Sequence, residues 1–409
     1  MAGYGAAFGR GVIIGAGAAF LYAAARETAS FARHARRESQ SGGEYAERTR
    51  LIDWAWAERV AIRASGQAPT LHPSAREQLR AQYSALLRDI EEPVARYTGK
   101  KLSLSGTAVE IMDRATWIRA NMVNFRDLLQ PMEELYREAA EVGGLGLGSS
   151  PVGMPMAARL MVSSQLGLLV GYLAQRVLGQ YDLSLLGREP ITGGKLYFVE
   201  PNIRQVEQSL RLPREELRRW IALHEATHAH EFEFHPWVRE YLNTALRTYL
   251  RLLADDMKRQ SGGNVFAAMA ARFAGNIWRG HNFIAALQTP EQRELLSRLQ
   301  ALMSLAEGYS NHVMNAVGRS LLPNFELIHE RVEHRQRQRS QAEVLFLKLT
   351  GLSMKMEQYK RGERFVDHVV RERGIAFANR AWESRENLPS ELEIRYPERW
   401  IARLEGMRA

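Results

Sequence analysis

The sequence predicts an α+β fold that is predominantly α-helical, and three observations support this prediction. Apolar residues recur at helical spacing along most of the chain, for example from Leu51 onward. Strand-like patterns are confined to two short stretches, residues 107–112 and 194–200. Hydrophobic residues make up 45% of the 409 residues, which is enough for a sizeable core. We therefore expect a small sheet within a mostly helical body.

The first half of the chain alternates helical patterns with turn-forming segments. A helix is expected up to about Tyr97, and alternating apolar and polar residues at 107–112 indicate a strand. Residues 113–142 have the pattern of a helix. Residues 143–155 are rich in Gly, Ser and Pro and are the best candidate for an internal loop, whereas residues 157–178 are nearly uncharged, as in a buried helix. The predicted strand therefore lies between helical segments.

The second half opens with the strongest strand candidate and continues as helices. Residues 194–200 combine apolar and aromatic side chains. Pro213 lies near the start of a helix whose first turn holds Glu215 and Glu216, where the helix dipole favours acids. Pro236 is expected to end or bend this helix because proline cannot continue the hydrogen-bond pattern. Helical patterns dominate from there to the end of the chain.

The length predicts one large domain or two closely packed ones, and the composition separates an N-terminal segment from the body. Residues 1–40 hold a Gly/Ala-rich apolar stretch and a polar linker. Residues 41–409 form the body, in which residues 41–150 could be a helical N-terminal subdomain. The uncharged run at 11–25 is shorter than the roughly 20 residues that span a bilayer.

This short apolar run leaves three interpretations of the N-terminus. We expect residues 1–26 to be a helix docked on the body of a cytoplasmic protein. The alternatives are association with a membrane through these residues and a signal peptide ending near Ala25. The chain has no cysteine, so any metal must be bound by His, Asp or Glu. Its net charge of +9 is interleaved with acids along the whole chain, so no specific nucleic-acid partner is expected.

The most informative stretch is His-Glu-Ala-Thr-His at residues 224–228, within an apolar, helix-compatible segment. Residues four apart share one face of a helix, so His224 and His228 can bind the same metal ion. Glu225 lies beside them, where a carboxylate can act as general base on a water at that metal. This arrangement is typical of zinc hydrolases and predicts a Zn²⁺ cofactor. The alternative is a solvated helix face that happens to carry two histidines.

A catalytic zinc site needs a third protein ligand, and Glu307 is the best candidate. It lies in an apolar segment, and a buried carboxylate needs a partner such as a metal. The alternative for Glu307 is a structural salt bridge. His235, which lies one position beyond the metzincin spacing, and His312, from the same segment as Glu307, are competing ligands.

Other polar residues could support this site. Asn311 lies one helical turn after Glu307 and could orient a ligating histidine. Tyr309 and His312 are candidate donors to a transition-state oxyanion. His230 is two positions past His228, so it should point away from the metal face and be exposed.

Taken together, these motifs resemble a family of zincin-like metallopeptidases (type 2), hydrolases of uncharacterised substrate, some of which are linked to the biosynthesis of a deazaflavin coenzyme. The resemblance runs from about Ile52 to Arg403 and includes, in order, five blocks: Val177-Leu178-Gly179-Gln180-Tyr181-Asp182, Tyr197-Phe198-Val199-Glu200-Pro201-Asn202, Trp220 through Pro236-Trp237, Glu307-Gly308 with His312-Val313-Met314, and Gly351-Leu352 with Lys355, Gln358-Tyr359 and Gly362. The family usually has an acid where this chain has Asn311 and Asn315.

The resemblance implies a zincin-like core with an active-site helix and a short edge strand or sheet, surrounded mostly by helices. It implies no particular substrate. In zincins an edge strand can pair with an extended substrate backbone, and we expect residues 195–200 to be that strand.

Two functions follow from these residues. The first is a zinc-dependent hydrolase, best described as a metallopeptidase acting on a peptide or protein, with His224, His228 and Glu307 as ligands and Glu225 as general base. The second is a non-catalytic binding or scaffold protein that keeps a zincin fold. An intact Glu225 favours the enzyme, because a purely structural metal site needs no general base.

Overall fold

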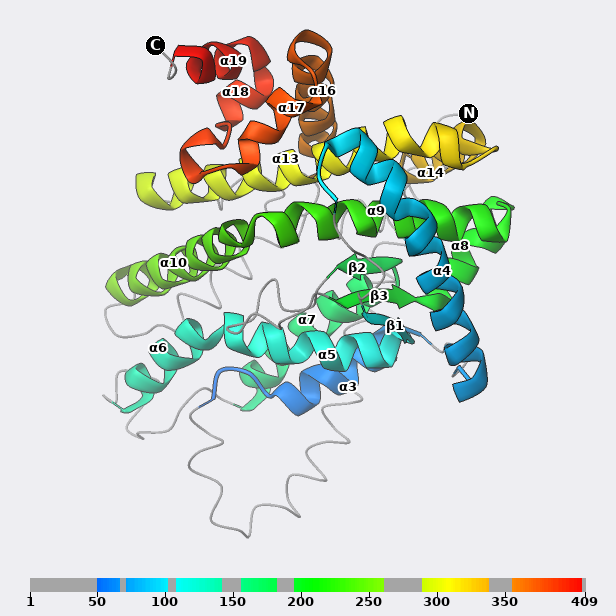
Figure 1. Ribbon diagram of the computed structural model, residues 1–409. Helices are drawn as coiled ribbons and strands as arrows, with labels where there is room; N and C mark the ends of the chain where they lie inside the picture. Colours follow the sequence, from blue (N-terminus) through cyan, green and yellow to red (C-terminus); the bar gives the residue numbers. More distant parts are fainter. Residues whose placement is uncertain are drawn as a thin grey trace, which may run out of the picture.

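The computed structural model describes seven stretches of the chain, residues 50–66, 71–101, 108–141, 156–181, 195–260, 289–337 and 355–406. The N-terminal segment 1–40 and the loop at 143–155 lie outside these residues. Within them, three strands lie among helices (Figure 1). The helices before the central strand are α3 (Trp54–Ala64), α4 (Pro73–Thr98), α5 (Arg114–Leu128), α6 (Gln130–Glu141) and α7 (Met156–Ala174).

The later helices carry the candidate site and the C-terminal part of the molecule. They are α8 (Glu200–Leu210), α9 (Arg214–Phe234), α10 (Pro236–Gln260), α13 (Pro290–Leu321), α14 (Phe325–Arg337), α16 (Lys355–Arg373), α17 (Ile375–Ala378), α18 (Glu391–Arg395) and α19 (Pro397–Gly406), with 3-10 turns η3 (Asn379–Trp382) and η4 (Arg385–Asn387). The predominantly helical α+β fold is therefore confirmed.

The sheet has the strand order β1-β3-β2. Strand β1 (Ala108–Met112) pairs in parallel with β3 (Lys195–Val199), and β2 (Gly179–Tyr181) pairs antiparallel with the other side of β3. The expectation that residues 195–200 form the edge strand is therefore wrong. Residues 196–199 are all buried, which is typical of a strand covered on both faces. The edge strand that packs on α9 (Arg214–Phe234) is β2.

Alternate residues of β3 belong to two hydrophobic cores. Leu196 and Phe198 pack with α4, α9 and α13, whereas Tyr197 and Val199 pack with α3, α5 and α7. Successive side chains of a strand point to opposite faces, so the sheet separates two helical layers (Figure 1). The C-terminal helices α16 to α19 lie along α13.

Proline sets two of the helix boundaries. Helix α9 ends at Phe234 and α10 begins at Pro236, which confirms that this proline interrupts the helix. The helix expected over 113–142 is divided at Leu129, because Pro131 occupies the first turn of α6 and cannot continue α5. No helix among the described residues is long and apolar enough to cross a bilayer.

Candidate metal centre

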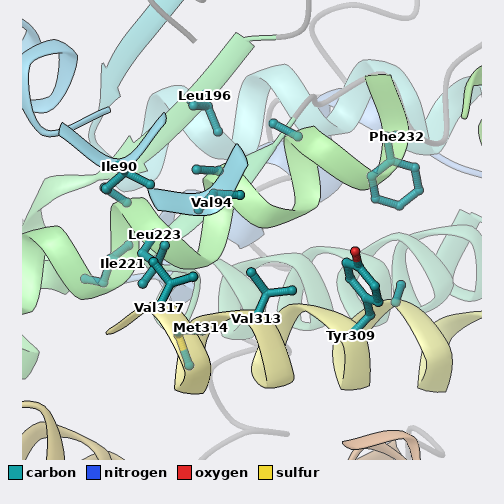
Figure 2. Close-up of a cluster of buried hydrophobic side chains, with 14 of the residues drawn as sticks. Ile90, Val94, Leu196, Ile221, Leu223, Phe232, Tyr309, Val313, Met314 and Val317 are labelled. Carbon is teal, nitrogen blue, oxygen red and sulfur yellow. The ribbon is translucent and has the colours of Figure 1, made fainter. Parts of the chain in front are cut away.

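Helix α9 presents His224 and His228 one turn apart, and α13 brings Glu307 beside them. One ligand atom from each of these three residues lies within 4.8 Å of the other two, and all three side chains are half-buried. The packing between α9 and α13 sets this juxtaposition. Leu223 and Phe232 of α9 and Tyr309 and Val317 of α13 belong to one hydrophobic core, in which the two helices pack on each other (Figure 2).

The two histidines are oriented by hydrogen bonds from their Nδ1 atoms. His228 Nδ1 is 3.1 Å from Glu231 Oε2, and His224 Nδ1 is 3.2 Å from Ser310 Oγ. Both rings therefore have Nε2 left for a metal. A carboxylate or hydroxyl behind a ligating histidine fixes the ring and, where it accepts the Nδ1 proton, raises the basicity of Nε2.

Neither Glu231 nor Ser310 was identified from the sequence. Glu231 lies three residues after His228 on α9, so the helical i, i+3 relation was the available signal for its contact with that ring. The contact of Ser310 with His224 joins two helices and had no local signal. Asn311, the residue expected in this role, is half-buried, and no hydrogen bond from it to either histidine occurs among the described residues.

The electrostatics of the cluster favour a cation. Burial lowers the pKa of His224 to about 3, assisted by the neighbouring His228, so His224 is neutral and able to bind a metal. Burial also opposes a charge on His228, but the carboxylates of Glu231, Glu307 and Glu225 outweigh it and raise the pKa of His228. The three carboxylates thus stabilise positive charge at this point, and a divalent ion would supply that charge.

Glu225 is 7% exposed and lies against the edge strand β2 at Gly179. It follows His224 directly on α9, and its charge reaches His228. Glu225 is thus a buried carboxylate beside two candidate metal ligands and outside the ligand cluster, a placement in which a carboxylate can act as general base.

The two candidate oxyanion donors are held in other contacts. The Tyr309 hydroxyl donates to Asn379 Oδ1 at 2.7 Å, and burial raises the pKa of this phenol. His312 lies between Tyr97, whose hydroxyl is 2.6 Å from Nε2, and Asp367, whose Oδ1 is 2.6 Å from Nδ1. Both ring nitrogens of His312 are thereby occupied, and the structure does not bring it into the metal cluster.

The remaining histidines of α9 face away from the ligand cluster. His230 is buried, not exposed as expected, and its Nε2 lies 3.1 Å from Thr98 Oγ1 and 2.9 Å from the carbonyl oxygen of Lys100. The reason is that α4 covers this face of α9. His235 ends the helix and its Nε2 is 3.1 Å from Lys100 Nζ, so it is not a metal ligand here.

The donor set fits zinc. Two imidazoles and one carboxylate, without sulfur, are a ligand combination of catalytic zinc sites, and three protein ligands leave a position open for water or substrate. The buried Glu231 and Ser310 behind the histidines complete the support that such sites need.

Comparison with known proteins agrees with this geometry. The family model for zincin-like metallopeptidases matches residues 52–401. A crystal structure of a protein from Chloroflexus aurantiacus, provisionally described as a hydrolase with a novel fold, is 42% identical and superimposes with a TM-score of 0.62, over 87% of this chain and 99% of that one. No curated protein matches the chain. The chain belongs to the zincin-like metallopeptidase family.

Proposed function

We propose that the protein is a zinc-dependent hydrolase that cleaves peptide bonds. The observation that carries this proposal is the buried Glu225 carboxylate next to a cluster of His224, His228 and Glu307. A metal-binding scaffold would need the three ligands but would gain nothing from a buried carboxylate held beside them and outside the ligand cluster. Membership of the zincin-like metallopeptidase family supports the same class of reaction, as does the similarity to the Chloroflexus aurantiacus protein that is provisionally described as a hydrolase.

When bound, zinc would supply Lewis-acid polarisation of a carbonyl and a lowered pKa of water. His224, His228 and Glu307 would hold the ion, while Ser310 and Glu231 keep the two imidazole rings in place. The Glu225 carboxylate accepts a proton from the attacking water. It then delivers that proton to the leaving amine nitrogen, so the base is regenerated in each cycle.

The edge strand β2 is the proposed docking site for substrate. Its partner on one side is β3, and the strand order places it at the rim of the described sheet. It also packs on α9, next to Glu225. An extended peptide that added to β2 as a further strand would run past the metal ligands, with its backbone held by hydrogen bonds. This edge takes the role that we had expected of residues 195–200.

The test is a digest of a peptide library by the full-length, zinc-loaded protein, run beside Glu225→Gln. We expect cleavage by the wild type, none above background by the variant, and one zinc ion per chain in both by elemental analysis. Equal zinc content and no cleavage by either protein, across peptide and folded-protein substrates, would instead favour the scaffold function.

A further inference from the structure

The backbone at Gly179 lies directly against the candidate general base, Glu225, and leaves no room for a side chain. A Cβ atom added at Gly179 would lie 2.6 Å from both Cγ and Oε1 of Glu225 and 2.8 Å from its Cδ. These separations are below 3.0 Å, which Cβ atoms do not adopt against non-bonded neighbours. Every residue other than glycine at this position would therefore displace the Glu225 carboxylate or the strand.

The strand is not free to yield. Gly179 pairs with Phe198 of the central strand. The residues around it are anchored by hydrogen bonds to three different elements: Val199 N to Leu178 O at 2.9 Å, Asn202 Nδ2 to Val177 O at 2.7 Å, and Trp117 Nε1 to Gln180 Oε1 at 2.8 Å. Moving β2 away from α9 would break these bonds together.

The helix on the other side of the contact is also fixed. Ala222 and Ala226, on either side of Glu225 in α9, are 0% and 1% exposed and belong to the main hydrophobic core. A close-packed core does not shift by half an ångström without loss of stability. The flexible part of the contact is the Glu225 side chain, which would have to turn into another rotamer.

We propose that Gly179 is a positioning residue for Glu225, and this inference rests on the proposed function. Because it has no side chain, β2 can approach α9 closely enough to restrict the Glu225 carboxylate to one orientation beside the metal ligands. The strand proposed to hold the substrate backbone then also sets the direction of the base. The contact between the Gly179 backbone and the Glu225 side chain thereby aligns the substrate with the group that transfers the proton.

The experiment measures binding of acetohydroxamic acid to the zinc-loaded, full-length protein. A hydroxamate chelates zinc and passes its acidic proton to a neighbouring base, so its affinity reports the position of the Glu225 carboxylate without requiring turnover. The variants are Gly179→Ala, Glu225→Gln, Glu225→Ala and the double variant Gly179→Ala with Glu225→Ala. Gly406→Ala is the matched control, because nothing lies within 4 Å of a Cβ at that glycine.

We expect Gly179→Ala to keep zinc binding, since the ligands are untouched, and to weaken acetohydroxamate by about tenfold, as for loss of one hydrogen bond to a charged group. Gly406→Ala should match the wild type. In the Glu225→Ala background the atoms nearest to the added methyl group, Cγ, Cδ and Oε1 of Glu225, are absent, so the methyl group has no carboxylate to displace. Adding Gly179→Ala there should change the affinity much less than it does beside Glu225.

An equal loss in both backgrounds would overturn the inference, because it would show general damage to the strand. The inference would also be overturned if Gly179→Ala left the affinity for acetohydroxamic acid unchanged while Glu225→Gln lowered it. If Glu225→Gln itself has no effect, the proposed function fails, and the positioning role fails with it. Should Gly179→Ala not fold, a double variant that folds and binds like Glu225→Ala supports the contact, and one that also fails to fold refutes it.

Discussion

Three carboxylates, those of Glu225, Glu231 and Glu307, act on His228, and their contacts assign them different tasks. Glu307 belongs to the ligand cluster, and Glu231 bonds to the far nitrogen of the ring. Glu225 lies against β2, outside the ligand cluster. Substituting each acid by its amide should therefore separate chemistry, ring orientation and metal binding.

Glu225→Gln keeps the size of the side chain and removes the base. Zinc should remain bound, while turnover should fall by a factor on the order of 10² or more, the usual range for general-base catalysis. Steady-state kinetics together with elemental analysis measure the two effects. Glu307→Gln is the contrasting variant, because it should lose zinc itself. Full activity of Glu225→Gln would contradict the mechanism.

Glu231→Gln removes the charge behind His228 without altering a ligand. We expect zinc affinity to fall by roughly 10- to 100-fold, as for other partners of ligating histidines. Competition with a chromophoric chelator measures it. Ser310→Ala provides the comparison and should lose less, because its contact with His224 is 3.2 Å long and involves a neutral hydroxyl. An unchanged zinc affinity in Glu231→Gln would show that the contact has no influence on the metal.

His235 should make the protein less stable in mild acid. Burial, with the nearby Lys100 and His230, lowers the pKa of His235 to about 4, against an ordinary value of roughly 6.5. Between these values the unfolded chain takes up a proton that the folded protein excludes. The stability contributed by neutral His235 is thus complete above about pH 6.5 and is lost as the pH falls towards 4.

Urea unfolding at pH 7 and pH 5 tests this expectation. The free energy of unfolding of the wild type should fall more between the two pH values than that of His235→Asn, which cannot titrate. His72→Asn is the control for the exchange of histidine for asparagine, because the His72 side chain is exposed. Parallel curves for wild type and His235→Asn would contradict the assignment.

At the scale of elements, the position of Glu307 depends on how closely α13 packs on α16. A Cβ at Gly308 would lie 2.2 Å from the Gly362 carbonyl carbon and 2.5 Å from Glu363 N, so backbone meets backbone. No side chain can turn aside to relieve this contact. Glu307 thus lies directly beside a point where the backbones of the two helices meet closely.

Gly308→Ala should accordingly lower the free energy of unfolding by about 1–3 kcal/mol, the range for overpacking. It should also weaken zinc binding, because α13 can relieve the clash only by shifting Glu307. Chemical denaturation and zinc titration measure the two effects, with Gly406→Ala as a glycine substitution in open space. A Gly308→Ala protein as stable as that control would show that the two helices separate without loss of stability.

Element boundaries and strand positions differ in how far local patterns predict them. Proline positions correctly indicated the break between α9 and α10, because the effect of proline on the backbone is local. The edge of the sheet was assigned to the wrong strand. A three-residue strand such as β2 has too few side chains to show a periodic pattern, and its place depends on contacts with β3 and α9.

At the scale of the whole molecule, residues 1–26 test whether the body functions alone. These residues lie outside the described stretches, and their apolar run is short for a bilayer span. Deleting them should leave a dissolved, zinc-loaded protein, which elemental analysis and size-exclusion chromatography would establish. Sedimentation of the full-length chain with lipid vesicles, but not of the truncated chain, would instead indicate a membrane anchor.

The sequence by itself determined the helical character of the molecule and the pair His224 and His228 with Glu225 between them. Both follow from relations within four residues, which the geometry of one helix fixes. Only the tertiary structure decided that Ser310 of α13 contacts His224, that His230 is buried, and that β2 borders Glu225. These outcomes depend on which faces of α4, α9 and α13 meet across long stretches of chain. Packing of whole elements sets such contacts, and local periodicity does not record them.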